Sequence, residues 1–145
     1  MRRETMKYYQ AAYKIIKEDL LDRAIANRQP DLYMGQKVML CLEWKDVSRE
    51  GYVFDPEPGI SIGRQVEGNE ICIREISVSS RHCRICLAEG QPVVEDLNSS
   101  NGTWIKRGFR KRAVTAVEPV FTGDILVIGT VRMKVTLFYF DMAAM

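Results

Sequence analysis

Three short polar stretches in the middle of the chain carry residue types that bind anions and peptide backbones. They centre on Arg64, Ser79 and Asn101. An arginine guanidinium presents a planar fork of donors that matches two oxygens of a phosphate or carboxylate, and a serine hydroxyl can bind a third oxygen. An asparagine carboxamide both donates and accepts, which suits a peptide backbone. Together these residue types predict a site for a phosphorylated peptide segment.

Each of these stretches adjoins a run of alternating apolar residues. Residues 60–62 precede Arg64, residues 83–88 follow Ser79, and residues 103–105 follow Asn101. Alternation of this kind is typical of half-buried strands, so the polar residues are predicted to lie in loops at strand ends. A rigid scaffold can then hold three such loops against one partner.

Short apolar runs separated by turn residues recur along most of the chain, which favours a β-sandwich over an α/β fold. The expected strands cover residues 38–44, 52–54, 60–62, 71–73, 83–88, 93–95, 103–105, 125–128 and 131–140. Turn signals such as Asp55-Pro56-Glu57-Pro58-Gly59 lie between them.

With these motifs in order, residues 36–141 resemble a forkhead-associated (FHA) domain, a phosphothreonine-peptide-binding module. The resemblance rests on Gly63-Arg64, Ser79-x-x-His82 and Asn101-Gly102, with further agreement at residues 69–73 and 122–129. It implies an all-β, two-sheet FHA-type sandwich whose binding loops lie at one end. Residues 1–35 are then an N-terminal helix and connector, and residues 142–145 a C-terminal tail.

The resemblance also implies roles for the polar residues. Arg64 and the Ser79 hydroxyl are expected to bind the phosphate, and Asn101 to hold the peptide backbone. Ser80 and Arg81 occupy positions that vary in the family, and each is a candidate for a further phosphate contact. A solvated side chain is the competing interpretation for Arg81.

Three residues are expected to support the site. Gly63 allows close approach of the backbone, and His82 and Gly102 brace the loops. A lone histidine with neither a nucleophile nor a metal partner is a poor catalyst candidate. The chain also lacks a nucleophile–base pair, a P-loop and a metal-ligand cluster in its sequence, so neither an enzyme nor a cofactor is predicted.

Composition is that of a globular protein without a strong bias. The 145 residues include 21 basic and 19 acidic side chains, which gives a net charge of +2 and disfavours a general nucleic-acid binder. No apolar run is long enough to span a bilayer, and a cytoplasmic location is expected. The four cysteines are then predicted to be free thiols used as small apolar residues, and the pair Cys83 and Cys86 would point to opposite faces of a strand rather than share a metal.

Residues 106–112 hold five cations around Gly108 and Phe109 and are predicted to form a hairpin turn. A contact with nucleic acid or anionic lipid is an alternative role for this turn.

Residues 5–27 are predicted to form an amphipathic helix. Its apolar stripe consists of Tyr9, Ala12, Ile16, Leu20 and Ala24, widened by Tyr13, Ile15 and Leu21. Thr5 is expected to cap its start, and Gln29-Pro30-Asp31 to limit its end. The stripe is expected to pack against the sandwich or a second copy of the chain, or to dock to a separate protein.

The sequence therefore predicts a phosphothreonine-dependent adaptor that binds the product of a Ser/Thr kinase. The alternative is a phosphate-independent FHA-like scaffold that uses the helix as its interface.

Overall fold

The computed structural model describes residues 3–27, 36–45 and 52–141. Within these ranges lie one helix and eleven strands. Their bounds are α1 Arg3–Asn27, β1 Gln36–Glu43, β2 Tyr52–Phe54, β3 Ile60–Gly63, β4 Ile71–Cys72, β5 Cys83–Ala88, β6 Gln91–Asp96, β7 Thr103–Arg107, β8 Arg110–Ala113, β9 Val117–Pro119, β10 Ile125–Ile128 and β11 Val131–Asp141.

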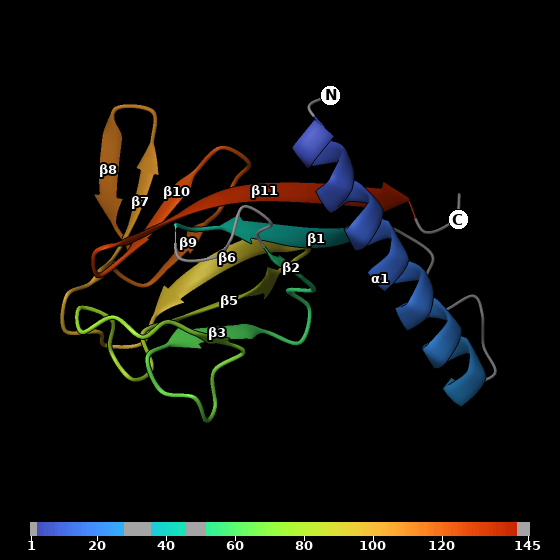
Figure 1. Cartoon of the computed structure of the whole chain (residues 1–145), viewed down its shortest axis with the longest axis horizontal. Helices are drawn as coiled ribbons and strands as arrows, with labels where there is room; N and C mark the ends of the chain where they lie inside the picture. Colours follow the sequence, from blue (N-terminus) through green and yellow to red (C-terminus); the bar gives the residue numbers. More distant parts are fainter. Residues whose placement is uncertain (1–2, 28–35, 46–51, 142–145) are drawn as a thin grey trace.

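The strands form two sheets that pack face to face, with the helix across one end (Figure 1). One sheet has the order β2-β1-β11-β10-β7-β8, and the other has the order β4-β3-β5-β6-β9. Neighbouring strands are antiparallel except β3 and β4, which pair in parallel. This arrangement confirms the predicted all-β sandwich with an N-terminal helix.

The first strand is buried on both faces, which explains its unbroken apolar run. Val38, Leu40 and Leu42 belong to the core between the two sheets. Met39 and Cys41 point to the other face, where they pack beneath α1. A strand between two apolar layers needs no polar alternation.

The helix packs against the outer face of the six-stranded sheet. Tyr8, Ala12 and Ile16, spaced four residues apart, are buried against β1 and β11. The Tyr9 ring lies 5.1 Å from the ring of Phe140, at the edge of the contact. For these residues the structure confirms that the apolar stripe packs against the chain's own sandwich.

Two details of the predicted helix are wrong. The centre of the buried stripe is Tyr8, which is 5% exposed, whereas Tyr9 is 38% exposed. Thr5 lies inside α1, which begins at Arg3, so it does not cap the helix. The side chains of Leu20, Leu21 and Ala24 and the segment Gln29-Pro30-Asp31 lie outside the described residues.

Two strands were not expected. β8 follows a two-residue connection, Gly108-Phe109, that joins Arg107 to its partner Arg110. Gly108 has φ +60°, which suits the first central position of a tight hairpin turn. The predicted hairpin is therefore confirmed, but its second arm is a strand with three cations in sequence, Arg110, Lys111 and Arg112, where no apolar alternation marks it. β9 is a three-residue edge strand and gives an equally weak signal.

Among the described residues, no helix combines the length and the apolar content that crossing a membrane requires.

Candidate functional site

Backbone hydrogen bonds align the loop after β3 with the loop before β5. The Arg64 N–H donates to the carbonyl of Ser79 at 2.9 Å, and the Gln65 N–H donates to the carbonyl of Ser80 at 3.2 Å. These bonds lie beyond the last paired residues of β3 and β5, Ile62 and Cys83, and hold the two loops together where the strand ladder has ended. Arg64 and Ser79 are thereby placed side by side although fifteen positions separate them in the chain.

Gly63 permits this close approach. A Cβ atom at this position would lie 2.2 Å from the carbonyl oxygen of Ser80, far inside van der Waals contact. The carboxamide of Asn69 adds a cross-link, since its Nδ2 donates to the carbonyls of Gln65 at 2.7 Å and Ser80 at 2.8 Å. The loop that carries Arg64 is thus tied at both ends to rigid backbone.

His82 joins the second loop to the third. Its side chain is fully buried, its Nδ1 accepts from the Ser79 N–H at 3.0 Å, and its Nε2 lies 2.9 Å from the carbonyl oxygen of Gly102. Because a backbone N–H can only donate and a carbonyl can only accept, the proton of this imidazole lies on Nε2. Both ring nitrogens are used, which leaves none for catalysis or metal binding.

Two further hydrogen bonds hold the third loop against the second. The Ser100 N–H donates to the Ser79 hydroxyl oxygen at 2.9 Å, and Asn101 Nδ2 donates to the carbonyl of Ser77 at 2.8 Å. The Ser79 hydroxyl therefore keeps its own proton free to donate to an anion. Asn101 keeps its carbonyl oxygen and a second N–H, so it can still both accept from and donate to a peptide backbone.

Asp96 fixes the turn that presents these residues. Its carboxylate accepts from the hydroxyls of Ser99 at 2.5 Å and Thr103 at 2.6 Å, and from the Ser99 N–H at 3.1 Å. Partial burial alone would raise the pKa of Asp96, but the hydrogen bonds from Ser99 and Thr103 outweigh it and lower that pKa. The turn is therefore held by an ionised carboxylate.

Three arginines surround the loops without an ion-pair partner among the described residues: Arg64, Arg74 and Arg81, all exposed. Arg81 lies beside the loop that carries Arg64, because a Cβ on Gly68 would be 3.7 Å from its guanidinium carbon. Ser80 is exposed too, and its carbonyl is engaged by Asn69. An anion at these loops would meet uncompensated positive charge.

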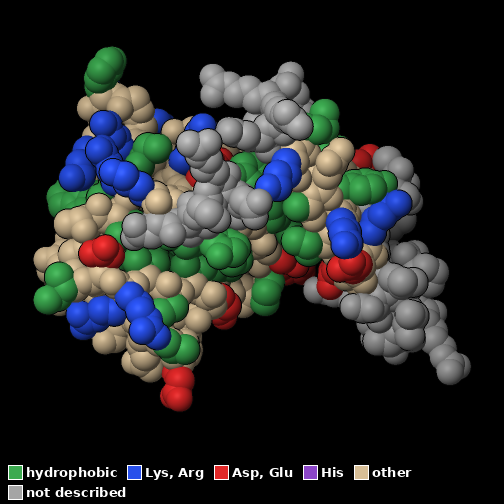
Figure 2. All heavy atoms as spheres, viewed as in Figure 1, with side chains coloured by type: hydrophobic (Ala, Val, Ile, Leu, Met, Phe, Trp, Pro, Cys, Tyr) green, Lys and Arg blue, Asp and Glu red, His purple; other side chains and the backbone are tan. Residues whose placement is uncertain are grey.

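The cations of the β7–β8 hairpin, unlike the three loop arginines, are partly engaged in contacts within the chain. Figure 2 shows Lys and Arg side chains gathered over the β7–β8 hairpin. Several of these cations are engaged within the chain. Arg107 binds both carboxylate oxygens of Asp124 at 2.7 Å, a hydrogen-bonded pair that raises the pKa of Arg107. Lys111 lies over the Trp104 ring at 5.1 Å, so fewer charges are available for nucleic acid or lipid than the sequence suggests.

The structure thus brings together all the residues that the sequence singled out for the site: Gly63, Arg64, Ser79, Ser80, Arg81, His82, Asn101 and Gly102. Sequence reasoning missed Asn69, Ser77 and Ser100, which hold the loops to one another. Asn69 lies in the stretch 69–73 that agrees with the family pattern, but no role was predicted for it. No pattern in the sequence marks Ser77 or Ser100, since a loop polar residue that bonds a distant backbone looks like any other.

The four cysteines are free thiols, as predicted. Cys83 is buried while Cys86, three positions on, faces outward from the core, so the two thiols do not converge. The prediction that all four act as apolar residues is wrong for Cys72. This thiol is exposed and donates to the carbonyl of Arg64 at 3.3 Å, because β4 is an edge strand and its alternate side chain faces solvent.

Comparison with known proteins matches residues 60–129 to the FHA domain family. An FHA domain-containing protein of Arabidopsis thaliana is 35% identical over 100 residues, which are 64% of this chain and 24% of that protein. The oxoglutarate dehydrogenase inhibitor of Corynebacterium glutamicum is 34% identical over 77 residues, 53% of this chain and 50% of that protein. The chain thus spans between a quarter and a half of the length of these relatives.

Solved FHA domains have the same fold. An FHA domain studied for phosphothreonine-dependent interactions has a TM-score of 0.56 at 25% identity, over 67% of this chain and 94% of that one. The FhaA FHA domain, solved in complex with the intracellular domain of Rv3910, has a TM-score of 0.56 at 25% identity, over 67% of this chain and 99% of that one. The sequence match and the two-sheet fold together show that this chain contains an FHA domain.

Proposed function

We propose that the chain binds phosphothreonine peptides through the loops that carry Arg64, Ser79 and Asn101. The observation that carries the proposal is the exposed Arg64, which has no ion-pair partner among the described residues and is held beside a Ser79 hydroxyl whose proton is free. Arg64 would bind two phosphate oxygens, and Ser79 would donate to a third. Ser80 and Arg81 lie next to them and would add contacts on the same side.

Asn101 would hold the main chain that flanks the phosphothreonine. Its free carbonyl oxygen and N–H can pair with one peptide group of the ligand. Gly63, His82 and Gly102 would act indirectly, because their contacts set the distance between the three loops. Pre-formed hydrogen bonds between the loops reduce the entropy that ligand binding must remove.

Relatives support this function. One similar solved domain is described by its phosphothreonine-dependent interactions, and another was solved bound to the intracellular domain of a second protein. A phosphate with nearly two negative charges can gain on the order of several kcal/mol from charge-assisted hydrogen bonds. This gain is enough to separate a micromolar affinity for the phosphorylated peptide from a negligible affinity for the unmodified one. The chain would therefore act as an interaction module and not as an enzyme.

The partner would be a protein phosphorylated by a Ser/Thr kinase, and the chain would act as a signalling adaptor in the cytoplasm. The alternative, a phosphate-independent scaffold that uses α1, is less well supported. The described part of the helix stripe is already buried against β1 and β11 of the same chain. A second copy or a separate protein would have to displace that contact.

The test is a titration of the chain with a degenerate peptide library in phosphothreonine, phosphoserine and unmodified forms. Arg64→Ala is expected to abolish binding of the phosphothreonine form without changing the unfolding midpoint, because its side chain is exposed. Arg132→Ala is the matched control, since Arg132 is an exposed arginine on β11 and has the same charge. Equal binding of all three peptide forms would remove the proposed function and favour the scaffold.

A further inference from the structure

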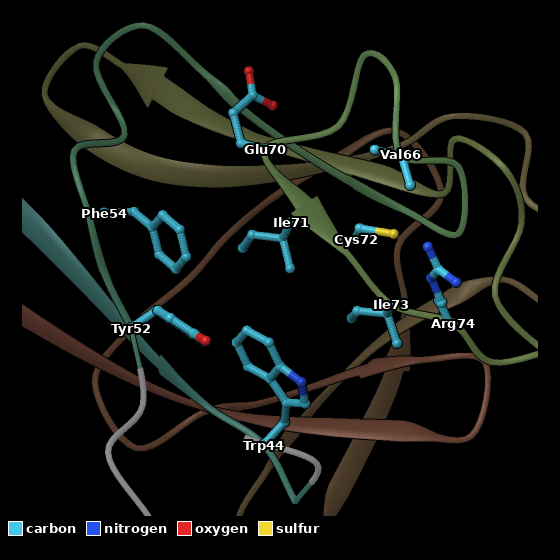
Figure 3. A pocket seen from close by; sticks show the side chains of 9 residues that line it. All are labelled: Trp44, Tyr52, Phe54, Val66, Glu70, Ile71, Cys72, Ile73 and Arg74. Carbon is cyan, nitrogen blue, oxygen red and sulfur yellow. The ribbon is translucent and has the colours of Figure 1, made fainter. Parts of the chain in front are cut away.

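An aromatic groove lies at the open side of the sandwich, between the edge strands β2 and β4. Its volume is about 640 Å³, within the range of sites that bind large side chains or small ligands. One wall carries Trp44, Tyr52 and Phe54, and the other carries Ile71 and Ile73. Figure 3 shows the three rings directed toward these isoleucines, with Arg74 at one end of the groove.

The aromatic wall is built as a row of rings and remains accessible. The ring centroids of Trp44 and Tyr52 lie 5.5 Å apart, and those of Tyr52 and Phe54 lie 6.1 Å apart. Tyr52 is 52% exposed, which is high for an aromatic residue in contact with two other rings. A preformed aromatic wall next to open space provides apolar contact area at little cost in side-chain ordering.

This groove continues into the surface beside Arg64. Val66 and Arg74 line both the groove and a shallower hollow that also includes Arg64 and Ile76. Val66 is 62% exposed and Ile76 is 90% exposed, so an apolar strip leads from the candidate phosphate site to the aromatic wall. The Cys72 thiol, inside the groove, donates to the carbonyl of Arg64 at 3.3 Å.

We propose that this groove binds an apolar segment of the same phosphorylated partner chain, with an aromatic or large aliphatic side chain seated against Tyr52. The proposal rests on the phosphothreonine-binding function and adds a second point of recognition to it. The continuity of the groove with the Arg64 surface favours one chain that occupies both. Residues 70–74, which include β4 and form the wall opposite the rings, extend over about 13 Å at ~3.3 Å per residue, so an extended segment crosses the groove in about four residues.

The charges of the groove lining favour an uncharged ligand segment next to the aromatic wall. Glu70, at its rim, is engaged as the acceptor of the Ser61 N–H at 2.7 Å. Arg74 is the remaining charged residue of the described lining, and it lies toward Arg64, where an acidic or phosphorylated residue would be bound. The chemistry therefore changes from cationic to apolar with distance from the phosphate.

The test uses a phosphothreonine library with six degenerate positions on each side of the phosphorylated residue. Aromatic or large aliphatic residues are expected to be enriched about four positions from the phosphothreonine on one side. A selected peptide and its truncation to two flanking residues on each side are then titrated. The long peptide is expected to bind about tenfold more tightly, as burial of one large apolar side chain predicts.

Variants locate this gain in the groove. Tyr52→Ser is expected to reduce the affinity of the long peptide to that of the short one and to leave the short peptide unchanged. Tyr139→Ser is the matched control, because Tyr139 is 50% exposed on β11 away from the groove. The long peptide should also protect Cys72 from alkylation, while the partly exposed Cys86 on β5 reacts at an unchanged rate.

Each other outcome overturns the proposal in a distinguishable way. Equal affinities of long and short peptides, or an unaltered rate of Cys72 alkylation, would show that the groove does not take part. Concentration-dependent dimerisation that Tyr52→Ser abolishes would assign the groove to a second copy of the chain. If even the short phosphothreonine peptide does not bind, the proposed phosphothreonine-binding function is wrong. The proposal that the same partner chain occupies the groove is then wrong as well.

Discussion

The Nδ1 atom of His82 accepts a hydrogen bond from the backbone N–H of Ser79 at 3.0 Å, and this bond fixes the backbone of the residue whose hydroxyl faces the candidate phosphate site. The same ring reaches Gly102 at 2.9 Å through Nε2. One buried side chain thus sets the distance between the second loop and the third. The function of His82 is therefore expected to be visible in stability and in ligand affinity together.

Substitution of His82 can separate these two bonds. His82→Ala leaves the Ser79 N–H and the Gly102 carbonyl unpaired and creates a cavity, so it is expected to lower the free energy of unfolding by about 2–4 kcal/mol. His82→Asn places an acceptor near the position of Nδ1, and His82→Gln places a donor near the position of Nε2. Each of these two variants should lose less stability than His82→Ala, as measured by urea unfolding.

Peptide titration of the same variants distinguishes the two bonds. His82→Asn, which can preserve the contact with Ser79, should retain more affinity for a phosphothreonine peptide than His82→Gln. If all three variants bind like the parent chain, the contact between His82 and Ser79 does not control the site.

Gly63 tests how closely the first two loops must approach. Gly63→Ala puts a Cβ 2.2 Å from the Ser80 carbonyl oxygen, a rigid backbone atom, so the loops must separate. We expect a loss of about 1–3 kcal/mol in the free energy of unfolding and a weaker phosphothreonine peptide complex. Gly90→Ala is the control, because a Cβ at Gly90 would have no atom of the described residues, its chain neighbours aside, within 4 Å. Its destabilisation should be limited to the roughly 1–2 kcal/mol that a positive φ costs a residue with a side chain. Unchanged affinity in Gly63→Ala would mean that the loop spacing tolerates the displacement.

Asp96 gives a pH-dependent prediction. Its pKa in the folded chain is lower than its ordinary value of 3.8, because hydrogen bonds from Ser99 and Thr103 outweigh the effect of partial burial. The ionised carboxylate therefore stabilises the fold fully above about pH 4, and this contribution falls as the pH decreases through the lowered pKa. Asp96→Asn is expected to lower the free energy of unfolding by about 1–3 kcal/mol at pH 7. The difference from the parent chain should shrink as the pH falls below about 4. A constant difference would mean that the charge of Asp96 plays no part.

The elements that could be predicted from sequence are those with a dense local signal. β5 and β10 have the predicted bounds because their apolar runs end at turn residues on both sides. β8 and β9 could not be predicted in this way, since each is stabilised by pairing at a sheet edge and not by a buried face of its own. Pairing of this kind depends on the neighbouring strand, which a local pattern does not contain.

The site shows the same division. The motif residues could be singled out because their types and order resemble a known family. The contacts that hold the loops together, such as Asn69 to Ser80 and Asn101 to Ser77, join residues eleven and twenty-four positions apart. The aromatic groove was likewise not predicted, because Trp44 and Ile71 meet only when the two sheets pack.

The contact between the helix and the sheet can be tested at Ala12, which is fully buried against β1 and β11. Ala12→Glu would place a charge at that contact and is expected to release α1 from the sheet. Burial raises the pKa of Cys41 beneath the helix to about 12, so in the parent chain this thiol should resist alkylation at pH 8–9. In Ala12→Glu the pKa of Cys41 should fall toward its ordinary value, and alkylation of Cys41, followed by mass spectrometry, should become faster. Ala11→Glu is the matched control, because Ala11 is exposed on the same helix and its substitution should leave Cys41 protected.

If Ala12→Glu keeps its affinity for a phosphothreonine peptide while Cys41 becomes reactive, the helix stabilises the sandwich without taking part in ligand binding. Loss of peptide affinity in a variant that keeps its loops folded would instead assign α1 a part in recognition.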